Sequence, residues 1–378
     1  MKSISFYKSA FISRCLKYSM INKSRKINRQ IVVFESDDWG SIRIPSKEVL
    51  NLLSKKDIVF SASNSYDRVD SLESNDDLEC LMEVLYSVKD KNNNPAKMTL
   101  DTIVANPDFE KIKSNAFDKY YYRPYPETLK KYPNHDRVIS LIKDGINNKI
   151  FMPQFHGREH LNFQKWLRFL QSGNNDALTC FDYEVYSNFI SVGNRLEHVL
   201  AAYDIENCED KYLIKKSIEE GLSLFESIFG FKSKTMIAPC YIWDDYIEEE
   251  SSKYKIDLMQ GGFIQVLSSY EKRNGNNRIG HFYGEKNKYG QFYSIRNCLF
   301  EPSQNKKYNS DYCLNQIDRM FKKGFPAIIS CHRLNFMGGL DIRNRDVNLR
   351  DFLSLLKKIT HRYPNVEFMS SDEVIGLY

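Results

Sequence analysis

The chain has 378 residues, of which 42% are hydrophobic and 27% charged, a composition typical of a globular protein with a sizeable core. No stretch approaches the roughly 20 apolar residues of a membrane span, and no segment has the pattern of a signal peptide. Eight cysteines are scattered without a C-x-x-C pair, which favours reduced thiols in a cytoplasmic protein. The length allows two domains, but α/β barrels of this size often form one.

The net charge of +5 is unevenly distributed along the chain. Before Glu35 there are eight basic residues and no acidic one, whereas the remainder has 46 basic and 49 acidic residues. We therefore expect a basic N-terminal arm, residues 1–29, and one domain over 30–378. The arm is compatible with peripheral contact to anionic lipid at the inner face of the membrane, although a solvated terminal helix is the simpler interpretation.

Apolar patterning predicts strands that alternate with helices. In chain order, we expect strands at Ile31–Phe34, Met98–Val104, Ile150–Phe155, Thr235–Ile237, Ala327–Ser330 and Val366–Met369. The expected helices are one capped by Ser46 and running through Leu53, and others at His160–Leu170, 211–230 and Leu349–Ile359. Tyr120–Pro126 is expected to be irregular. Residues 261–303 have few helical signals and are expected to form an insertion over the barrel mouth. The alternation indicates an α/β fold with a mainly parallel sheet or barrel.

Titratable residues follow several of these predicted strands. In parallel α/β folds, functional side chains gather at the carboxyl ends of the strands. Here those positions hold Asp37 and Asp38, His156, Pro239 with Cys240, and His332.

His156 and His160 are four residues apart, a spacing that places both on one face of a helical turn. Neutral imidazoles are common zinc ligands, and a catalytic zinc site uses three protein ligands and an open position. We expect the third ligand to be a carboxylate or another histidine. For the pair taken alone, ordinary surface or core histidines remain the alternative.

Asp37 and Asp38 are neighbours, and adjacent strand residues point to opposite faces. Gly40 allows a bend after which both carboxylates could share one site, one binding a metal and the other acting as general base. A solvated acidic turn is the alternative. His332, directly after an apolar strand, is placed to act as a general acid, or it is an ordinary core or loop histidine.

These motifs in this order resemble the polysaccharide-deacetylase family (NodB-like, carbohydrate esterase type). The matching stretches are Ser36-Asp37-Asp38, His156-Gly157-Arg158-Glu159-His160, Ala238-Pro239-Cys240-Tyr241 and Ile329-Ser330-Cys331-His332, within residues 30 to 375. The resemblance implies a distorted (β/α) barrel of seven or eight strands, NodB-like. The family pattern has an arginine two residues before Pro239, where this chain has Ile237, so the resemblance is to a divergent member.

The resemblance also implies roles for particular residues. Asp38, His156 and His160 would hold a divalent metal, zinc first although other first-row metals also suit such ligands. Asp37 would be the base, His332 the acid, and the Cys240 N–H an oxyanion donor. Candidates to replace the missing arginine are Arg158, Arg296 and Arg333, and candidates to tune the acid are Asp244, Asp245 and Glu301. Further candidate substrate contacts are Trp39, Cys240, Tyr241, Arg296, Glu301, Arg333 and Asn335.

The function implied is a metal-dependent hydrolase that removes an acyl group, most simply N-acetyl, from a sugar in bacterial surface polysaccharide biosynthesis, such as that of capsule or O-antigen. The expected partner is an acylated sugar, an oligosaccharide, or a lipid- or nucleotide-linked sugar, and not a nucleic acid. Alternatives are a related metal-dependent glycosidase and a non-catalytic sugar-binding protein on the same fold. An inverzincin-type protease with Glu159 as base also matches H-x-x-E-H, and that alternative requires a helix across the whole motif.

Overall fold

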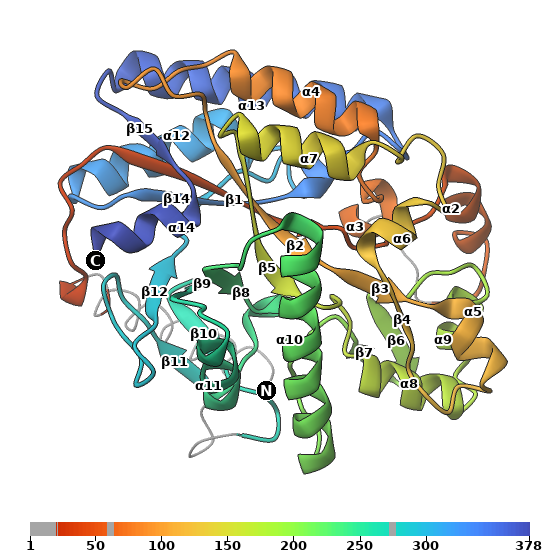
Figure 1. Ribbon diagram of the computed structural model, residues 1–378. Helices are drawn as coiled ribbons and strands as arrows, with labels where there is room; N and C mark the ends of the chain where they lie inside the picture. Colours follow the sequence, from red (N-terminus) through yellow and green to blue (C-terminus); the bar gives the residue numbers. More distant parts are fainter. Residues whose placement is uncertain (1–19, 21, 59–63, 272–276) are drawn as a thin grey trace.

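A mainly parallel sheet organises the protein, and its strands alternate with helices along the chain (Figure 1). The computed structural model describes residues 20, 22–58, 64–271 and 277–378, so most of the expected basic arm, 1–19 and 21, lies outside the described residues. Within this described part, the main sheet has nine strands in the order β12-β9-β8-β5-β2-β1-β14-β13, with β15 paired to β1. They are β1 (Ile31–Trp39), β2 (Met98–Ile103), β5 (Phe151–Gly157), β8 (Thr235–Ile237), β9 (Leu258–Gly261), β12 (Phe292–Ile295), β13 (Cys298–Leu299), β14 (Ala327–His332) and β15 (Glu367–Met369).

The two edges of this sheet meet at one short stretch of chain. β12 pairs with β9 at one edge and β13 pairs with β14 at the other, while Arg296 and Asn297 alone separate β12 from β13. The Arg296 N–H donates to the Gly261 carbonyl at 2.7 Å, and the Asn297 N–H donates to the Ile328 carbonyl at 3.0 Å. One continuous segment therefore joins both edges, and the sheet is a distorted (β/α) barrel, as expected from the motifs.

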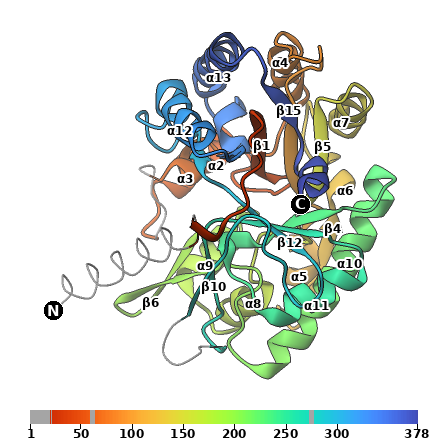
Figure 2. The same cartoon turned by 90° about the vertical axis from the view of Figure 1, so that its left-hand side faces the viewer.

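Helices cover the outside of the barrel. Figure 2 shows α4, α7, α12 and α13 side by side over one part of the sheet, with α10 and α11 over another. The helices are α2 (Lys47–Leu53), α3 (Ser65–Val69), α4 (Asn75–Tyr86), α5 (Phe109–Ser114), α6 (Tyr125–Leu129), α7 (Val138–Asn147), α8 (Phe163–Gln171), α9 (Asn175–Phe181), α10 (Cys208–Phe229), α11 (Asp245–Lys253), α12 (Ser310–Lys322), α13 (Ile342–Arg362) and α14 (Ser371–Val374), with 3-10 turns η1 (Pro239–Tyr241), η2 (Arg333–Phe336) and η3 (Ile375–Leu377). Their apolar faces pack against the strands and bury the core. For example, the rings of Phe34 in β1 and Phe352 in α13 pack edge-on with their centroids 5.0 Å apart.

Local sequence signals explain several element ends. The Ser46 side chain accepts from the Val49 N–H and begins α2, as predicted. Helix α10 ends at Phe229 and is capped by Gly230, whose φ of 82° needs the conformational freedom of glycine. β1 continues five residues beyond the predicted end at Phe34, because the polar residues after Phe34 are also buried and stay paired with β14 as far as Asp37. The polar end of this strand lies inside the barrel.

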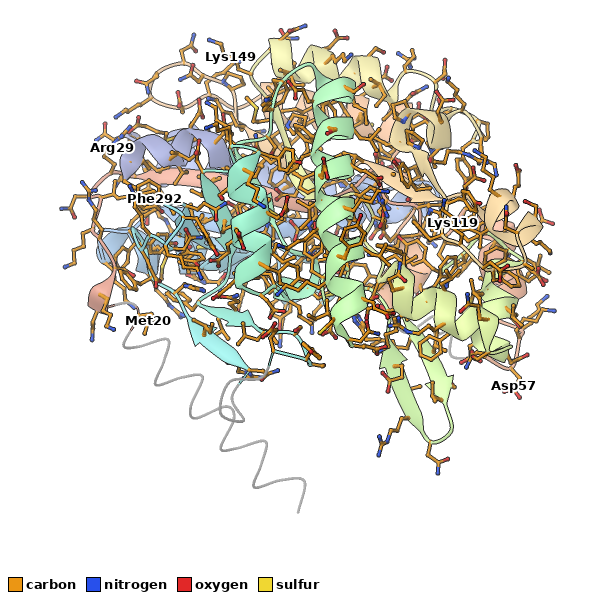
Figure 3. All side chains as sticks on the ribbon, turned by 60° about the horizontal axis from the view of Figure 1, so that its bottom comes forward. Met20, Arg29, Asp57, Lys119, Lys149 and Phe292 are labelled. Carbon is orange, nitrogen blue, oxygen red and sulfur yellow. The ribbon has the colours of Figure 1, made fainter. Side chains whose placement is uncertain are left out.

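Three small antiparallel pairs lie outside the main sheet in the described residues. They are β3 (Ala105–Pro107) with β4 (Tyr122–Pro124), β6 (Phe189–Val192) with β7 (Arg195–His198), and β10 (Ile264–Val266) with β11 (Arg278–Gly280). The expected irregular segment at Tyr120–Pro126 therefore contains a short strand. Residues 261–303, expected as one insertion, instead divide between the β10–β11 hairpin and the barrel strands β12 and β13. Figure 3 shows the β6–β7 hairpin extending away from the body.

The described end of the expected basic arm lies against the body. The Arg25 N–H donates to the Tyr283 carbonyl at 3.0 Å, and the Arg29 guanidinium forms an ion pair of 2.7 Å with Glu367. Figure 3 labels Arg29 near the outer edge of the molecule. Among the described residues, no helix has the length and apolar character that crossing a membrane requires.

Candidate metal centre and active site

A bulge at the end of β1 turns two neighbouring carboxylates toward one cavity. The pairing of β1 with β2 shifts register between Ser36 and Trp39, and Asp38 has a φ of 76°. Positive φ is uncommon outside glycine, but aspartate tolerates it better than most residues. Because the extra residue breaks the alternation of a regular strand, Asp37 and Asp38 both line the same cavity.

The histidine pair is assembled differently from the helical turn that its spacing predicts. His156 lies in β5, the chain turns at Gly157 with a φ of 138°, and His160 lies in the loop before α8, which begins at Phe163. The predicted helix from His160 therefore starts three residues too early. The two imidazole rings are still 5.0 Å apart in an edge-on arrangement. Because the motif contains no helix, the inverzincin-type alternative is wrong.

Asp38, His156 and His160 form a buried group that could hold a metal ion. One ligand atom from each lies within 4.8 Å of the others. The Asp38 Oδ1 atom is 3.4 Å from His156 Nε2 and 3.3 Å from His160 Nε2. Two imidazoles and a carboxylate with an open side toward a cavity are a suitable donor set for a catalytic divalent metal.

Hydrogen bonding in this group supports the fit. His156 Nδ1 is 3.0 Å from the Ile237 carbonyl, which can only accept, so Nδ1 carries the proton and Nε2 presents a lone pair. Asp38 Oδ1 and His156 Nε2 are buried without a hydrogen-bond partner among the described residues. Two buried acceptors that face each other need a positive charge between them. Burial lowers the pKa of His160 well below its usual value despite Asp38, which leaves it neutral, as a metal ligand must be.

A cavity of about 390 Å³ opens over this group. Its wall includes Asp37, His332, Cys240 and Tyr241, which come from three different parts of the sequence. Cys240 and Tyr241 have φ values of 58° and 56°, so the turn η1 after β8 presents two consecutive residues in the left-handed region. The parallel topology therefore brings the predicted strand-end residues to one place.

Arg296, at the barrel closure, binds Asp37. Its Nη1 and Nη2 atoms donate to the two carboxylate oxygens at 2.6 Å each, and its Nε donates to Glu35 at 2.6 Å. Burial acts to raise the pKa of Asp37, but the Arg296 charge and hydrogen bonds outweigh it, so the pKa is lowered. Nη2 also donates to Asp101 at 2.9 Å, and burial together with Asp37 raises the pKa of Asp101 well above its usual value. Asp37 is thus held as a carboxylate, whereas the pKa of Asp101 is raised.

Glu301 forms a hydrogen bond with the Nδ1 atom of His332. His332 Nδ1 is 2.5 Å from a Glu301 oxygen, and the other Glu301 oxygen accepts from the Asn335 side chain at 2.8 Å. His332 Nε2 lies 3.8 Å from Asp37. Burial acts to lower the pKa of His332, but the negative charges of Glu301 and Asp37 raise it to about 10. His332 therefore carries a proton near neutral pH.

Several expected substrate contacts lie behind the cavity instead of lining it. Arg333 is fully buried and donates to Asp70 at 3.0 Å and to Glu73 at 2.8 Å. Trp39 is also fully buried and donates to the Ser36 hydroxyl. Arg296, Glu301 and Asn335 are buried as partners of Asp37 and His332. Of the seven candidate substrate contacts, Cys240 and Tyr241 line the cavity, and the other five are buried beside it.

The cavity also contains residues that sequence reasoning did not select. Arg43, Tyr66, Asn188 and His198 all line it. Arg43 follows β1 by four residues, and this closeness to a strand end was a usable signal. Asn188 precedes the β6–β7 hairpin and His198 is its last residue, far from any predicted barrel strand, and their local sequence carries no such signal. Arg158, another candidate for the missing arginine, binds Glu159 and Glu220 instead.

No family model matches this sequence, and no curated protein matches it. Similar solved structures include a probable polysaccharide deacetylase from Pseudomonas aeruginosa PAO1, with 7% identity, a TM-score of 0.46, and coverage of 93% of this chain and 91% of that one. A putative polysaccharide deacetylase from Mycobacterium smegmatis has 10% identity, a TM-score of 0.41, and coverage of 93% and 90%. A 4-alpha-glucanotransferase from Thermococcus litoralis has 12% identity and a TM-score of 0.42, and this chain spans 40% of its length. Two of these three proteins are described as a probable and a putative polysaccharide deacetylase.

Proposed function

We propose that this protein is a metal-dependent hydrolase that removes an acyl group, most simply N-acetyl, from a sugar. The observation that carries the proposal is the buried Asp38–His156–His160 group, which faces a cavity beside a deprotonated carboxylate and a protonated imidazole. The metal, zinc foremost, would supply a Lewis acid that polarises the acyl carbonyl. The substrate would be an intermediate of bacterial surface polysaccharide synthesis, free or linked to a lipid or a nucleotide.

Asp37 and His332 divide the proton transfers between them. Asp37, kept ionised by Arg296, accepts a proton from the attacking water as general base. His332, kept protonated by Glu301, donates a proton to the leaving amine or alcohol. The Cys240 N–H, in the turn after Pro239, would donate to the developing oxyanion. Each role matches a protonation state that the surroundings favour.

The test begins with the metal content of the purified protein. We expect near-stoichiometric divalent metal in the wild type and its loss in a His156→Ala/His160→Ala double variant. His361→Ala is the matched control, because His361 is exposed near the end of α13, away from the cavity. Metal that is absent from the wild type even after incubation with zinc would overturn the proposal.

The second measurement is acetate release from a panel of N-acetyl and O-acetyl sugars. Asp37→Asn should retain the metal, because Asp37 is not among the three candidate ligands. It should lose hydrolysis by roughly 10²–10⁴-fold, the usual contribution of a general base. An Asp37→Asn variant with wild-type acetate release would show that the carboxylate is not the base. Metal binding without hydrolysis of any acyl sugar would favour a non-catalytic sugar-binding protein.

A further inference from the structure

Arg43 introduces a permanent positive charge into the wall of the cavity. It lies in the turn after β1, its side chain lines the cavity beside Asp38, and 5% of its surface is exposed. Among the described lining residues, it is the one lysine or arginine. It pairs with Asp38 at 3.5 Å, but it is neither a candidate metal ligand nor a proton-transfer residue in the chemistry proposed above. Its place in the cavity therefore requires a separate explanation.

The Arg43 guanidinium makes few contacts for a buried cation. A guanidinium has five N–H donors, and within the described residues Arg43 makes one hydrogen bond, from Nη1 to the Asn188 Oδ1 atom at 3.3 Å. Its Nη2 atom lies 3.5 Å from Asp38, and its Nε atom lies 3.4 Å from Asp70 without a hydrogen bond. Since buried charged groups are normally well bonded, Arg43 keeps donor capacity for a ligand.

The carboxylates near Arg43 are already bound to other groups. Asp70 accepts from Arg333 Nε at 3.0 Å through its other oxygen. Asp38 is the carboxylate of the candidate metal group. With Asp38 neutralised by a metal cation, Arg43 keeps Asp70, which it shares with Arg333. No carboxylate among the described residues accepts a hydrogen bond from the Arg43 guanidinium, so its remaining N–H donors can bind an anion in the cavity.

The surroundings also fix the direction of the guanidinium. The rings of Tyr66 and Tyr186 lie 5.8 Å and 5.6 Å from its central carbon. The Asn188 side chain, which accepts from Nη1, itself donates to Asp67 at 2.6 Å. A planar group held in this way is preorganised to bind a planar or tetrahedral oxyanion through paired hydrogen bonds.

We propose that Arg43 binds an anionic group of the substrate, a carboxylate or a phosphate, so that the enzyme acts on acyl sugars that carry a negative charge close to the acyl group. This inference rests on the proposed function for the reaction, but the recognition of an anionic sugar can be measured without turnover. A carboxylate would belong to the acylated sugar ring itself. A phosphate would belong to the linkage of that sugar to a carrier.

The test compares pairs of sugars in which one member carries an anionic group that the other lacks. N-acetylgalactosamine and N-acetylgalactosaminuronic acid differ by a hydroxymethyl group against a carboxylate. N-acetylglucosamine and its 1-phosphate differ by the phosphate. Binding is measured by calorimetry at physiological salt on metal-supplemented Asp37→Asn protein, which should not turn the sugars over. We expect one anionic sugar to bind at least ~10-fold more tightly than its neutral partner, a typical gain for charge-assisted bonds, and the pair that shows the preference identifies the source of the charge.

Variants assign the preference to Arg43. Arg43→Gln in the same background should remove the preference, and Arg43→Lys should retain part of it, because the charge remains without the planar fork. Arg195→Gln is the matched control, since Arg195 is an exposed arginine at the tip of the hairpin that flanks the cavity. It should leave the preference unchanged. Metal content and melting temperature confirm that each variant is folded and loaded.

Two results would overturn the inference. The first is that neither anionic sugar binds more tightly than its neutral partner to Asp37→Asn protein, a comparison that does not depend on folding of the Arg43 variants. The second is that Arg195→Gln reduces the preference as much as Arg43→Gln, which would indicate general electrostatic attraction. A charge preference without acetate release by the wild type would reject the proposed reaction and leave the anionic ligand standing. Acetate release from neutral sugars without a charge preference would do the reverse.

Discussion

Arg296 donates hydrogen bonds of 2.6 Å from Nη1 and Nη2 to the two carboxylate oxygens of Asp37. The two residues are 259 positions apart in the sequence, and they meet because Arg296 lies where β12 and β13 close the barrel. The arginine that the family pattern puts two residues before Pro239 is Ile237 here. An arginine from the closing segment thus binds the candidate base in this chain.

We predict that Arg296→Lys lowers kcat by roughly 10–100-fold, because a lysine retains the charge but cannot hold both oxygens of Asp37, and small misplacements of a reacting group are costly. KM should change little, since Arg296 does not line the cavity. Steady-state kinetics on the best acyl sugar provide the measurement. Arg362→Lys, at an exposed arginine of α13, should leave kcat unchanged. Wild-type kcat in Arg296→Lys would show that the bidentate contact is not needed.

Replacing a carboxyl group that contacts Arg296 by an amide should have different effects at Asp101 and at Asp37. Asp101→Asn replaces a carboxyl group whose pKa is raised well above its usual value by a neutral amide of the same shape, which can still accept from Arg296. We therefore expect its unfolding free energy to stay within about 1 kcal/mol of the wild type, as for a preserved hydrogen bond, and its activity within a few-fold. Asp37→Asn should lower hydrolysis by roughly 10²–10⁴-fold, as stated above. Denaturant unfolding and acetate release test the pair, and equal loss of activity in both variants would show that Asp101 is ionised and needed.

The alkaline limit of activity should depend on Glu301. The pKa of His332 is raised to about 10, where Glu301 and Asp37 outweigh the opposing effect of burial. Glu301→Gln removes one of these charges, so the pKa should fall and the alkaline limb of the kcat profile should move to lower pH. An unmoved limb would mean that another group limits the rate at high pH.

The same shift has a consequence for stability. A histidine with a raised pKa in the folded state contributes its full stabilisation below its unfolded pKa of about 6.5 and loses it as the pH rises through the folded pKa. The part of the unfolding free energy that depends on His332 should therefore decline between about pH 6.5 and pH 10. Urea unfolding of the wild type and His332→Gln over this range should show the two curves converging toward high pH.

Gly40 should tolerate no side chain. Its φ is 79°, and an added Cβ would lie 2.2 Å from the Ile103 carbonyl oxygen. Gly40→Ala should lower the unfolding free energy by roughly 2–4 kcal/mol, from backbone strain and overpacking together, and should weaken metal binding through its neighbour Asp38. Gly376→Ala is the control, because nothing lies within 4 Å of a Cβ there. Thermal unfolding of both variants with a metal titration provides the measurement, and equal stability of both would refute the prediction.

The sequence was sufficient for the barrel and for the residues at its strand ends. Short apolar runs such as Ile31–Phe34 and Ala327–Ser330 predicted buried strands, and both lie within observed strands. Because parallel strands bring their carboxyl ends together, Asp38, His156 and His332 could be expected in one place from their positions after such runs. The spacing of His156 and His160 predicted their proximity but gave the wrong cause, since a turn at Gly157 brings them together.

The partners of these residues depended on the tertiary structure. Arg296 was one of three candidate arginines, and its choice follows from the closure of the barrel, which no local pattern encodes. Arg43 reaches the cavity from a turn close to the end of β1, whereas Asn188 reaches it from the base of a hairpin, where neither periodicity nor spacing indicates a site. The reason is physical: strands and their ends are set by hydrophobic patterns a few residues long, whereas contacts over 200 residues apart exist only after the whole chain has packed.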